Sequence, residues 1–291
     1  MKITLLGTGS PLPDPRRAGP ATLVSTSSAH LLVDCGRAVV MRLVGAGVVP
    51  PMLSAVLLTH LHSDHLVDLY QLVITSWHQG RARPQRVFGP RGTRRFVEGT
   101  MALWEAERSA RIAHELRPST AAFEIEVTEI EAGTIWDDGT MRITAVAVAH
   151  QPVRDAFGFV FEAGGRKLVF SGDTAYCPAL VEAARGADAL VHECFVHREM
   201  KPSPNRSAEG MRNVAAYHTL PAEVGRVARE AGARLLVLNH FVPTRFDRAA
   251  LVAEVRETWR GPLVVGEDLM SYDCETRVLS HREARLSFSL D

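Results

Sequence analysis

Short apolar runs alternate along the chain with polar segments rich in glycine and proline. Apolar runs bounded by turn residues predict buried strands, and apolar residues spaced three and four positions apart predict helices. The pattern predicts strands at residues 2–6, 21–25, 30–33, 55–59, 85–88, 123–130, 141–149, 159–162, 167–170, 189–192, 235–238 and 263–265. It predicts helices at residues 37–44, 64–76, 93–106, 177–184, 221–231 and 247–259.

Each half of the chain begins with strands of antiparallel type and continues into strand–helix units. This order predicts an α/β protein in which two sheets pack face to face with helices outside, a four-layer αββα sandwich. The sequence contains no low-complexity segment and no obvious linker. We therefore expect a single domain over residues 1–291, in which residues 77–117 form a possible substrate-facing insertion.

Four potential metal ligands lie within six positions, directly after the apolar run at residues 55–58. They are His60, His62, Asp64 and His65. Imidazole and carboxylate groups crowded at the end of a strand pack poorly in a core but form a good cage for a small dication. The alternative interpretation is a polar loop that happens to be rich in histidine.

Three further candidate ligands, His150, Asp173 and His240, also follow apolar strands. Loops at strand ends are where α/β proteins place their chemistry. Taken singly, each has an ordinary alternative, such as a hydrogen-bonded surface histidine or an aspartate in a turn. Together with the first cluster, they predict one metal site assembled from four strand ends.

The composition narrows the class of protein further. The chain is 46% hydrophobic, enough for a sizeable core, and 33 basic residues balance 33 acidic ones. This balance argues against a dedicated nucleic-acid-binding protein, which usually has a basic excess.

The four cysteines form no CxxC pair, which predicts free thiols in a reducing compartment. Without a signal-peptide pattern or a transmembrane stretch, we expect a soluble cytoplasmic protein with no membrane partner.

One local basic surplus stands out against this balance. Residues 78–118 contain nine arginines and four glutamates. Arginine makes planar contacts to phosphate or sulfate, so this segment is a candidate for substrate contact. The alternative is a solvated helix face whose charges are partly paired, for example Glu107 with Arg111.

The order of the ligands resembles that of the metallo-β-lactamase superfamily. The run from Phe170 to Thr174 is similar to the superfamily strand that carries a bridging aspartate, and the resemblance covers nearly the whole chain. Within the superfamily, the chain resembles the ribonuclease Z and arylsulfatase branch. The segments that carry this second resemblance are residues 11–20, residues 191–194 and residues 216–219.

The resemblance implies two divalent metal ions. His60, His62 and His150 would hold the first, Asp64, His65 and His240 the second, and Asp173 would bridge them. Zinc is the expected metal, although manganese and iron also suit these ligands. Two such ions would share a hydroxide at neutral pH. Asp64 would orient this hydroxide in addition to binding the second ion.

A proton donor completes the expected machinery. His218 is the candidate acid for the leaving oxygen, and Glu193 would hold its tautomer. The alternatives are a polar loop histidine and a surface carboxylate.

Asp34, at another strand end, is either an acceptor that supports the ligand loop or a turn-forming aspartate.

These features predict a dinuclear metal-dependent hydrolase of phosphodiesters or related anionic esters of small or medium size. The alternatives are an arylsulfatase, a tRNA 3′-processing endoribonuclease of ribonuclease Z type, an iron-dependent oxidoreductase and a non-catalytic RNA-binding module. A tRNA substrate is disfavoured at this stage. His150 and Asp173 lie only 23 positions apart, which leaves no room for the tRNA-binding arm of long-form bacterial ribonuclease Z. The family resemblance also implies a homodimer.

Overall fold

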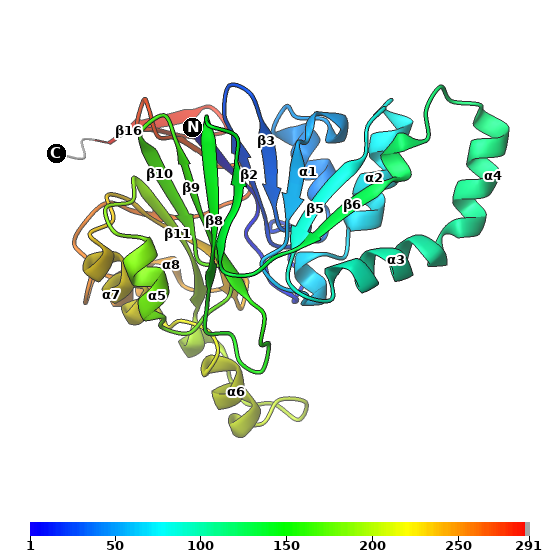
Figure 1. Ribbon diagram of the computed structural model, residues 1–291. Helices are drawn as coiled ribbons and strands as arrows, with labels where there is room; N and C mark the ends of the chain where they lie inside the picture. Colours follow the sequence, from blue (N-terminus) through cyan, green and yellow to red (C-terminus); the bar gives the residue numbers. More distant parts are fainter. Residues whose placement is uncertain (289–291) are drawn as a thin grey trace.

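The computed structural model describes residues 1–288 and consists of two stacked sheets with helices on both outer faces (Figure 1). Within these residues the larger sheet has nine strands in the order β16-β15-β14-β1-β2-β3-β4-β5-β6. The strands are β1 (Lys2–Gly7), β2 (Ala21–Ser25), β3 (His30–Val33), β4 (Ala55–Leu57), β5 (Gln85–Gly89), β6 (Ile125–Glu129), β14 (Ser271–Asp273), β15 (Val278–His281) and β16 (Ala284–Ser287).

The second sheet has seven strands within the described residues, in the order β13-β12-β11-β10-β9-β8-β7. They are β7 (Gly133–Asp137), β8 (Met141–Ala147), β9 (Phe157–Ala163), β10 (Arg166–Phe170), β11 (Ala189–Phe195), β12 (Leu236–Val242) and β13 (Leu263–Val265). Strands β10 to β13 run parallel, as do β3 to β6 of the larger sheet. Since parallel strands place their carboxyl ends at one edge, each sheet has an edge where the following loops gather.

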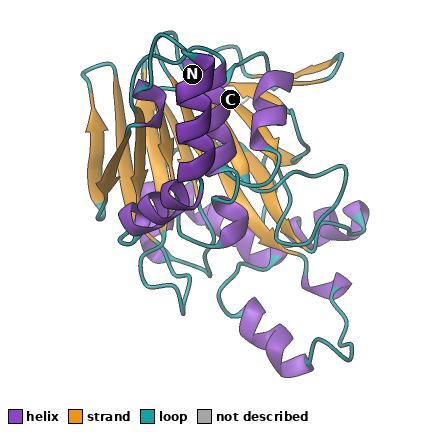
Figure 2. Ribbon diagram, turned by 90° about the vertical axis from the view of Figure 1, so that its right-hand side faces the viewer, coloured by secondary structure: helices purple, strands orange, loops and turns teal. Residues whose placement is uncertain are grey.

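Helices cover the two outer faces. Helices α1 (Val39–Gly45), α2 (Leu69–His78) and α3 (Thr93–Leu103) pack on the larger sheet, and α5 (Pro178–Ala183), α7 (Pro221–Ala231) and α8 (Arg248–Val255) pack on the smaller one. The C-terminal end of α3 and all of α4 (Glu105–Glu115) project from the body, as does α6 (Ala208–Ala215), the isolated lower helix in Figure 2. No helix among residues 1–288 is long and apolar enough to cross a membrane.

The four-layer sandwich predicted from the sequence is confirmed, and most of the predicted strands and helices are present. Helices α4 and α6 and strands β7 and β14 to β16 were not predicted. Helix α4 has no buried residue and β16 is exposed along its length, so neither has the apolar stripe on which the prediction depended. Helix α2 begins at Leu69 rather than at residue 64, because a 3₁₀ turn (Ser63–His65) precedes it.

The layer between the two sheets is the main core. It contains side chains from both sheets, among them Phe159 and Phe161 of β9 and Leu31 of β3, which are fully or almost fully buried. These rings fill the space between the sheets behind the loops at the strand ends. The core therefore fixes the positions of both strand edges relative to each other.

We expect Phe159→Ala to lower the free energy of unfolding by about 3–5 kcal/mol, because it removes a buried ring and leaves a cavity. The measurement is denaturant unfolding followed by circular dichroism. Leu103→Ala, at a side chain that is 84% exposed, is the matched control and should change stability by no more than about 0.5 kcal/mol. Equal losses in the two variants would contradict this assignment of the core.

Candidate metal centre

The seven predicted metal ligands come together at one end of the two sheets. The cluster from His60 to His65 follows β4 of the larger sheet. His150 and Asp173 follow β8 and β10 of the smaller sheet, and His240 lies in β12. Segments 180 residues apart in the sequence therefore meet at one point. Six of the seven are buried, and His62 is the most exposed.

The ligands form two adjacent groups. One contains His60, His62, His150 and Asp173, and the other Asp64, His65 and His240; within each group the candidate ligand atoms lie within 4.8 Å of one another. Asp173 Oδ2 lies between the groups, 3.8 Å from His60 Nε2, 3.5 Å from His65 Nε2 and 3.4 Å from His240 Nε2. This position brings the Asp173 carboxylate close to histidines of both groups.

Imidazole nitrogens that face each other at short range show that the site suits cations. His60 Nε2 is 2.9 Å and His150 Nε2 is 3.3 Å from His62 Nδ1, and His65 Nε2 is 3.2 Å from His240 Nε2. Lone pairs aimed at a common point repel unless a proton or a metal ion lies between them. Within the described part of the chain, the buried Asp64 Oδ2 also has no hydrogen-bond partner. A divalent cation in each group would satisfy these atoms.

The electrostatics of the site favour the metal-binding protonation state at His60, His150 and Asp173, whereas at His65 and His240 the nearby Asp173 carboxylate outweighs burial and raises the pKa. Burial lowers the pKa of His60 well below its usual value and that of His150 to about 4, which keeps both rings neutral. Burial alone would raise the pKa of Asp173, but His240 and His65 outweigh it and hold the pKa well below its usual range. Neutral imidazole and ionised carboxylate are the forms that bind metals.

Hydrogen bonds orient two of the ligand rings, one to a backbone carbonyl and one to a side-chain hydroxyl. His150 Nδ1 lies 3.0 Å from the Tyr217 carbonyl, to which it donates, so that Nε2 is left free to bind a metal. His60 Nδ1 lies 3.0 Å from the hydroxyl of Thr59. The sequence did not single out Thr59 or Tyr217. Each is next to a predicted functional residue, but only the folded chain shows that its polar atom meets a ligand.

His240 occupies a β-bulge rather than a loop after a strand. The register between β11 and β12 pairs Glu193 with Asn239 and then Cys194 with Phe241, which leaves His240 unpaired. Its φ of 44° is left-handed, an unusual conformation for a residue other than glycine. Bulges redirect a side chain out of the strand alternation, and this one directs His240 toward the ligand groups.

Asp34 is a hydrogen-bond acceptor beneath the ligand loop. Of the two interpretations of this residue, a supporting acceptor or a turn-forming aspartate, the structure therefore favours the first. Asp34 accepts from the backbone N–H of Thr59 at 2.8 Å and from the Thr59 hydroxyl. His65 Nδ1 is 2.8 Å from its other oxygen. The carboxylate therefore fixes the tautomer of His65 with Nε2 directed at the second ligand group.

We expect Asp34→Asn to weaken metal binding by about 10–100-fold, because the amide cannot hold His65 as a carboxylate does. Asparagine keeps the size of the side chain and tolerates the left-handed backbone at this position (φ 60°). Competition with a chromophoric chelator measures the affinity. Asp137→Asn, on the exposed strand β7, is the control and should bind metal like the wild type. Unchanged affinity in Asp34→Asn would show that the hydrogen bond is dispensable.

The predicted acid His218 lies beside the ligand groups and is paired with Glu193. Its Nδ1 is 2.7 Å from Glu193 Oε1, and its ring centroid is 5.3 Å from that of His150. Burial lowers the pKa of His218, but the Glu193 carboxylate outweighs this and raises the pKa to about 9. Glu193 also accepts from the backbone N–H of Thr174, next to Asp173. It lies buried within β11, not at the surface.

The basic segment at residues 78–118 is less basic than its composition suggests. Glu107 pairs with Arg111 at 2.9 Å as expected, and Glu115 pairs with both Arg111 and Arg117. Trp77, at the start of this region, is buried against neighbouring side chains. Helices α3 and α4, whose sequences include Arg94, Arg95, Arg108 and Arg111, nevertheless project from the body on one side of the molecule (Figure 1).

Comparison with known proteins agrees with this architecture. Residues 30–241 match the family described as the beta-lactamase superfamily domain. Ribonuclease Z of Mycobacterium bovis (strain BCG / Pasteur 1173P2) is 39% identical over 95% of this chain and 99% of its own length. Ribonuclease Z of Mycobacterium sp. (strain KMS) is 40% identical over 84% of this chain and 85% of its own length.

Solved structures share the fold at lower sequence identity. The metallo-beta-lactamase fold protein YhfI from Bacillus subtilis superimposes with a TM-score of 0.73 at 22% identity, covering 93% of this chain and 98% of its own. The short form of human tRNase Z gives a TM-score of 0.71 at 23% identity, covering 94% of this chain and 99% of its own. The chain belongs to the metallo-β-lactamase superfamily, in the branch that contains ribonuclease Z, and is a metal-dependent hydrolase of ester bonds.

Proposed function

We propose that this chain is a ribonuclease Z, an endoribonuclease that cleaves precursor tRNA on its 3′ side with two divalent metal ions. The observation that carries this proposal is the match to ribonuclease Z over nearly the full length of both chains. The intact ligand groups and the His218–Glu193 pair support it, because RNA cleavage needs both an activated water and a protonated leaving group.

The expectation that tRNA is disfavoured is corrected here. The interval between His150 and Asp173 does hold a hairpin, β9–β10, and has no room for a long arm. Relatives named ribonuclease Z nevertheless align over 99% of their own length with 95% of this chain, so a chain of this size is compatible with that name. A small phosphodiester, the first expectation, is a simpler form of the bond in RNA. We infer that the projecting helices α3 and α4 provide RNA contacts in place of the arm.

The residues would divide the work as follows. One ion would be held by His60, His62 and His150, and the other by Asp64, His65 and His240. Asp173 would bind both ions. Two bound divalent ions supply acidified water and stabilise charge on a phosphoryl group. Asp64, whose carboxylate has a second oxygen besides the one that would bind the ion, would also orient the attacking water. His218 Nε2 would give a proton to the leaving oxygen while Glu193 holds Nδ1.

The test is cleavage of an end-labelled precursor tRNA by the purified protein at low concentration, with and without chelator. We expect a single metal-dependent cut on the 3′ side of the tRNA, and much slower cleavage of an unstructured RNA of equal length. Bis-aryl phosphate and a matched aryl sulfate are assayed in parallel. An enzyme that hydrolyses either small ester efficiently but leaves the precursor intact would refute the proposal.

Two details of the proposal have separate measurements. Histidine and aspartate ligands suit zinc, and elemental analysis of the purified protein distinguishes zinc from manganese or iron. An iron-loaded protein that consumes oxygen would instead favour the oxidoreductase alternative. The expected homodimer stays a prediction, which light scattering in solution tests directly.

A further inference from the structure

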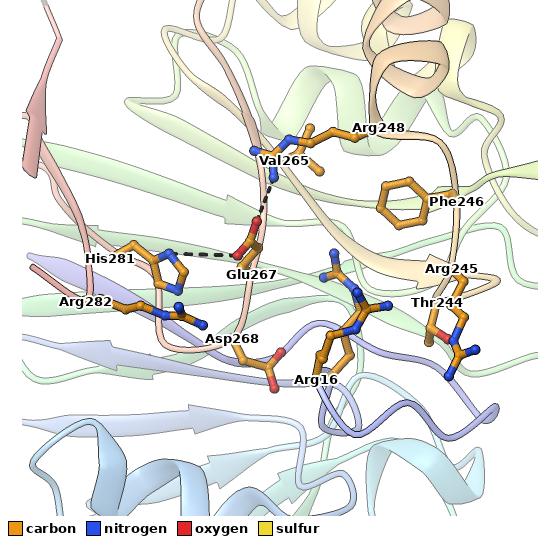
Figure 3. A pocket seen from close by; sticks show the side chains of 11 residues that line it. Arg16, Thr244, Arg245, Phe246, Arg248, Val265, Glu267, Asp268, His281 and Arg282 are labelled. Atoms are coloured by element: carbon orange, nitrogen blue, oxygen red, sulfur yellow. Dashed lines mark hydrogen bonds and ion pairs between the residues drawn. The ribbon is translucent and has the colours of Figure 1, made fainter. Parts of the chain in front are cut away.

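A second cavity shares none of the candidate metal ligands (Figure 3). Its volume is about 320 Å³, and it is bounded by the loops that follow β1, β12 and β13 and by the turn between β15 and β16. Small-molecule pockets begin at about 300 Å³, so this cavity is large enough for a compact ligand. We name it the arginine pocket.

Five arginines from distant parts of the sequence line the arginine pocket: Arg16, Arg17, Arg245, Arg248 and Arg282. The only carboxylates in its lining among the described residues are Glu267 and Asp268. The lining therefore carries five positive charges against two negative ones, a surplus of three. Asp14, outside the lining, pairs with two of the arginines and reduces the surplus to two.

Two of these arginines keep donors free for a ligand. Arg282 has no carboxylate partner within residues 1–288, whereas Arg248 is held by Glu267 at 2.6 Å. Arg17 donates from one nitrogen, Nη1, to the Thr8 hydroxyl and the Gly266 carbonyl, and its guanidinium lies 4.7 Å from the centre of the Phe241 ring. Its remaining N–H groups have no acceptor in the described structure. Guanidinium groups in such numbers suit phosphate oxygens.

The lining also contains groups that complement the rest of a nucleotide. Glu267 is an acceptor for hydroxyl or amino donors, and the ring of Phe246 forms part of the wall. We propose that the arginine pocket binds a mononucleotide, with its phosphate on the arginines and its ribose or base near Glu267 and Phe246. This inference does not depend on the function proposed for the metal centre.

A free nucleotide fits this lining better than a passing RNA strand does. An extended polyanion would place several phosphates along the wall, and some would lie against Glu267 and Asp268, where like charges repel. A mononucleotide carries its charge at one end only. It can therefore place the phosphate among Arg16, Arg245 and Arg282 and its uncharged end near the carboxylates.

The pocket also has a short structural connection to the metal centre. Arg17 holds Thr8 through its hydroxyl, and the Thr8 carbonyl accepts from the backbone N–H of Phe241 at 3.1 Å. Phe241 directly follows His240 of the second ligand group. A ligand that draws Arg17 toward the cavity would therefore act on the bulge that carries His240.

The experiment measures binding of AMP and of inorganic phosphate to the purified metal-loaded protein by titration calorimetry. We expect AMP to bind more tightly than phosphate. The double variant Arg245→Gln/Arg282→Asn should weaken AMP binding about tenfold or more, because it removes two of the three proposed charge-assisted contacts to the phosphate. Asparagine suits the left-handed backbone of Arg282 (φ 54°), and thermal unfolding confirms that the variant is folded.

Two control variants keep the outcomes distinct. Arg142→Gln/Arg185→Gln removes two exposed arginines on β8 and after α5 and should bind AMP like the wild type. His62→Ala should also retain AMP binding. If His62→Ala lost AMP binding while the pocket variant bound AMP normally, AMP would be placed at the metal centre and the proposal overturned. No binding of AMP at millimolar concentration, or equal affinity for AMP and phosphate, would also overturn it. A pocket variant that loses affinity for RNA but keeps its affinity for AMP would overturn the proposal as well.

Discussion

His62→Ala is expected to lower kcat/KM by about 10³-fold or more, because losing a metal ligand removes several kcal/mol of transition-state stabilisation. His62 is the best position for this test. Its Nδ1 lies 2.9 Å from His60 Nε2 and 3.3 Å from His150 Nε2, so it contacts both other histidines of its group. It is also the most exposed ligand, so alanine should disturb the fold least.

The measurements are kcat/KM on bis-aryl phosphate and on precursor tRNA, together with the metal content per chain. The variant should lose metal from one of the two groups and lose both activities together. His30→Ala removes a histidine at the start of β3 whose described contact is the Ser25 hydroxyl, and it should retain metal and activity. Full activity of His62→Ala, or of the wild type after complete chelation, would rule out the metal mechanism.

His218→Ala is expected to slow RNA cleavage by about 10²–10⁴-fold, the usual contribution of general acid catalysis. The same change should have little effect on bis(4-nitrophenyl) phosphate, whose leaving group departs without a proton. This difference separates a proton donor from a structural residue, because a damaged site would lose both activities. A similar loss on both substrates would show that His218 serves the architecture of the site.

The pH dependence gives a second readout for the same pair. Glu193 raises the pKa of His218 to about 9, so the imidazole stays protonated at neutral pH and loses its proton as the pH rises through that value. RNA cleavage should therefore fall on the alkaline side. Glu193→Gln removes the charge that raises the pKa, so the alkaline limb should move to lower pH. A limb that stays in place would show that another group limits the rate.

The ligand set could be predicted because its members occupy a recognisable local position. His60 to His65, His150 and Asp173 each follow an apolar run that forms a strand, and a polar metal-binding residue at that point is visible without any tertiary contact. The substrate could not be predicted in the same way. The short interval before Asp173 is real, but relatives named ribonuclease Z match this chain over almost their full length, so the interval alone does not exclude tRNA.

The apolar pattern likewise predicted the sheets better than the projecting elements. Helix α4 is stabilised by pairs such as Glu107 with Arg111, and no residue of it is buried. Helix α6 also contains no buried residue. A method based on hydrophobic periodicity detects elements that pack on a core, so these two were missed for one physical reason.

The sequence by itself determined the four-layer architecture and the residue types at the strand ends, because buried strands and metal ligands both leave local patterns. Tertiary structure alone decided how those ends meet. The bulge at His240, the contact of Asp34 with His65, and the pairing of Glu193 with His218 all join residues on separate segments. The arginine pocket likewise unites Arg16 with Arg282. Such contacts depend on strand order and register, which the packing of the whole core sets and no local pattern encodes.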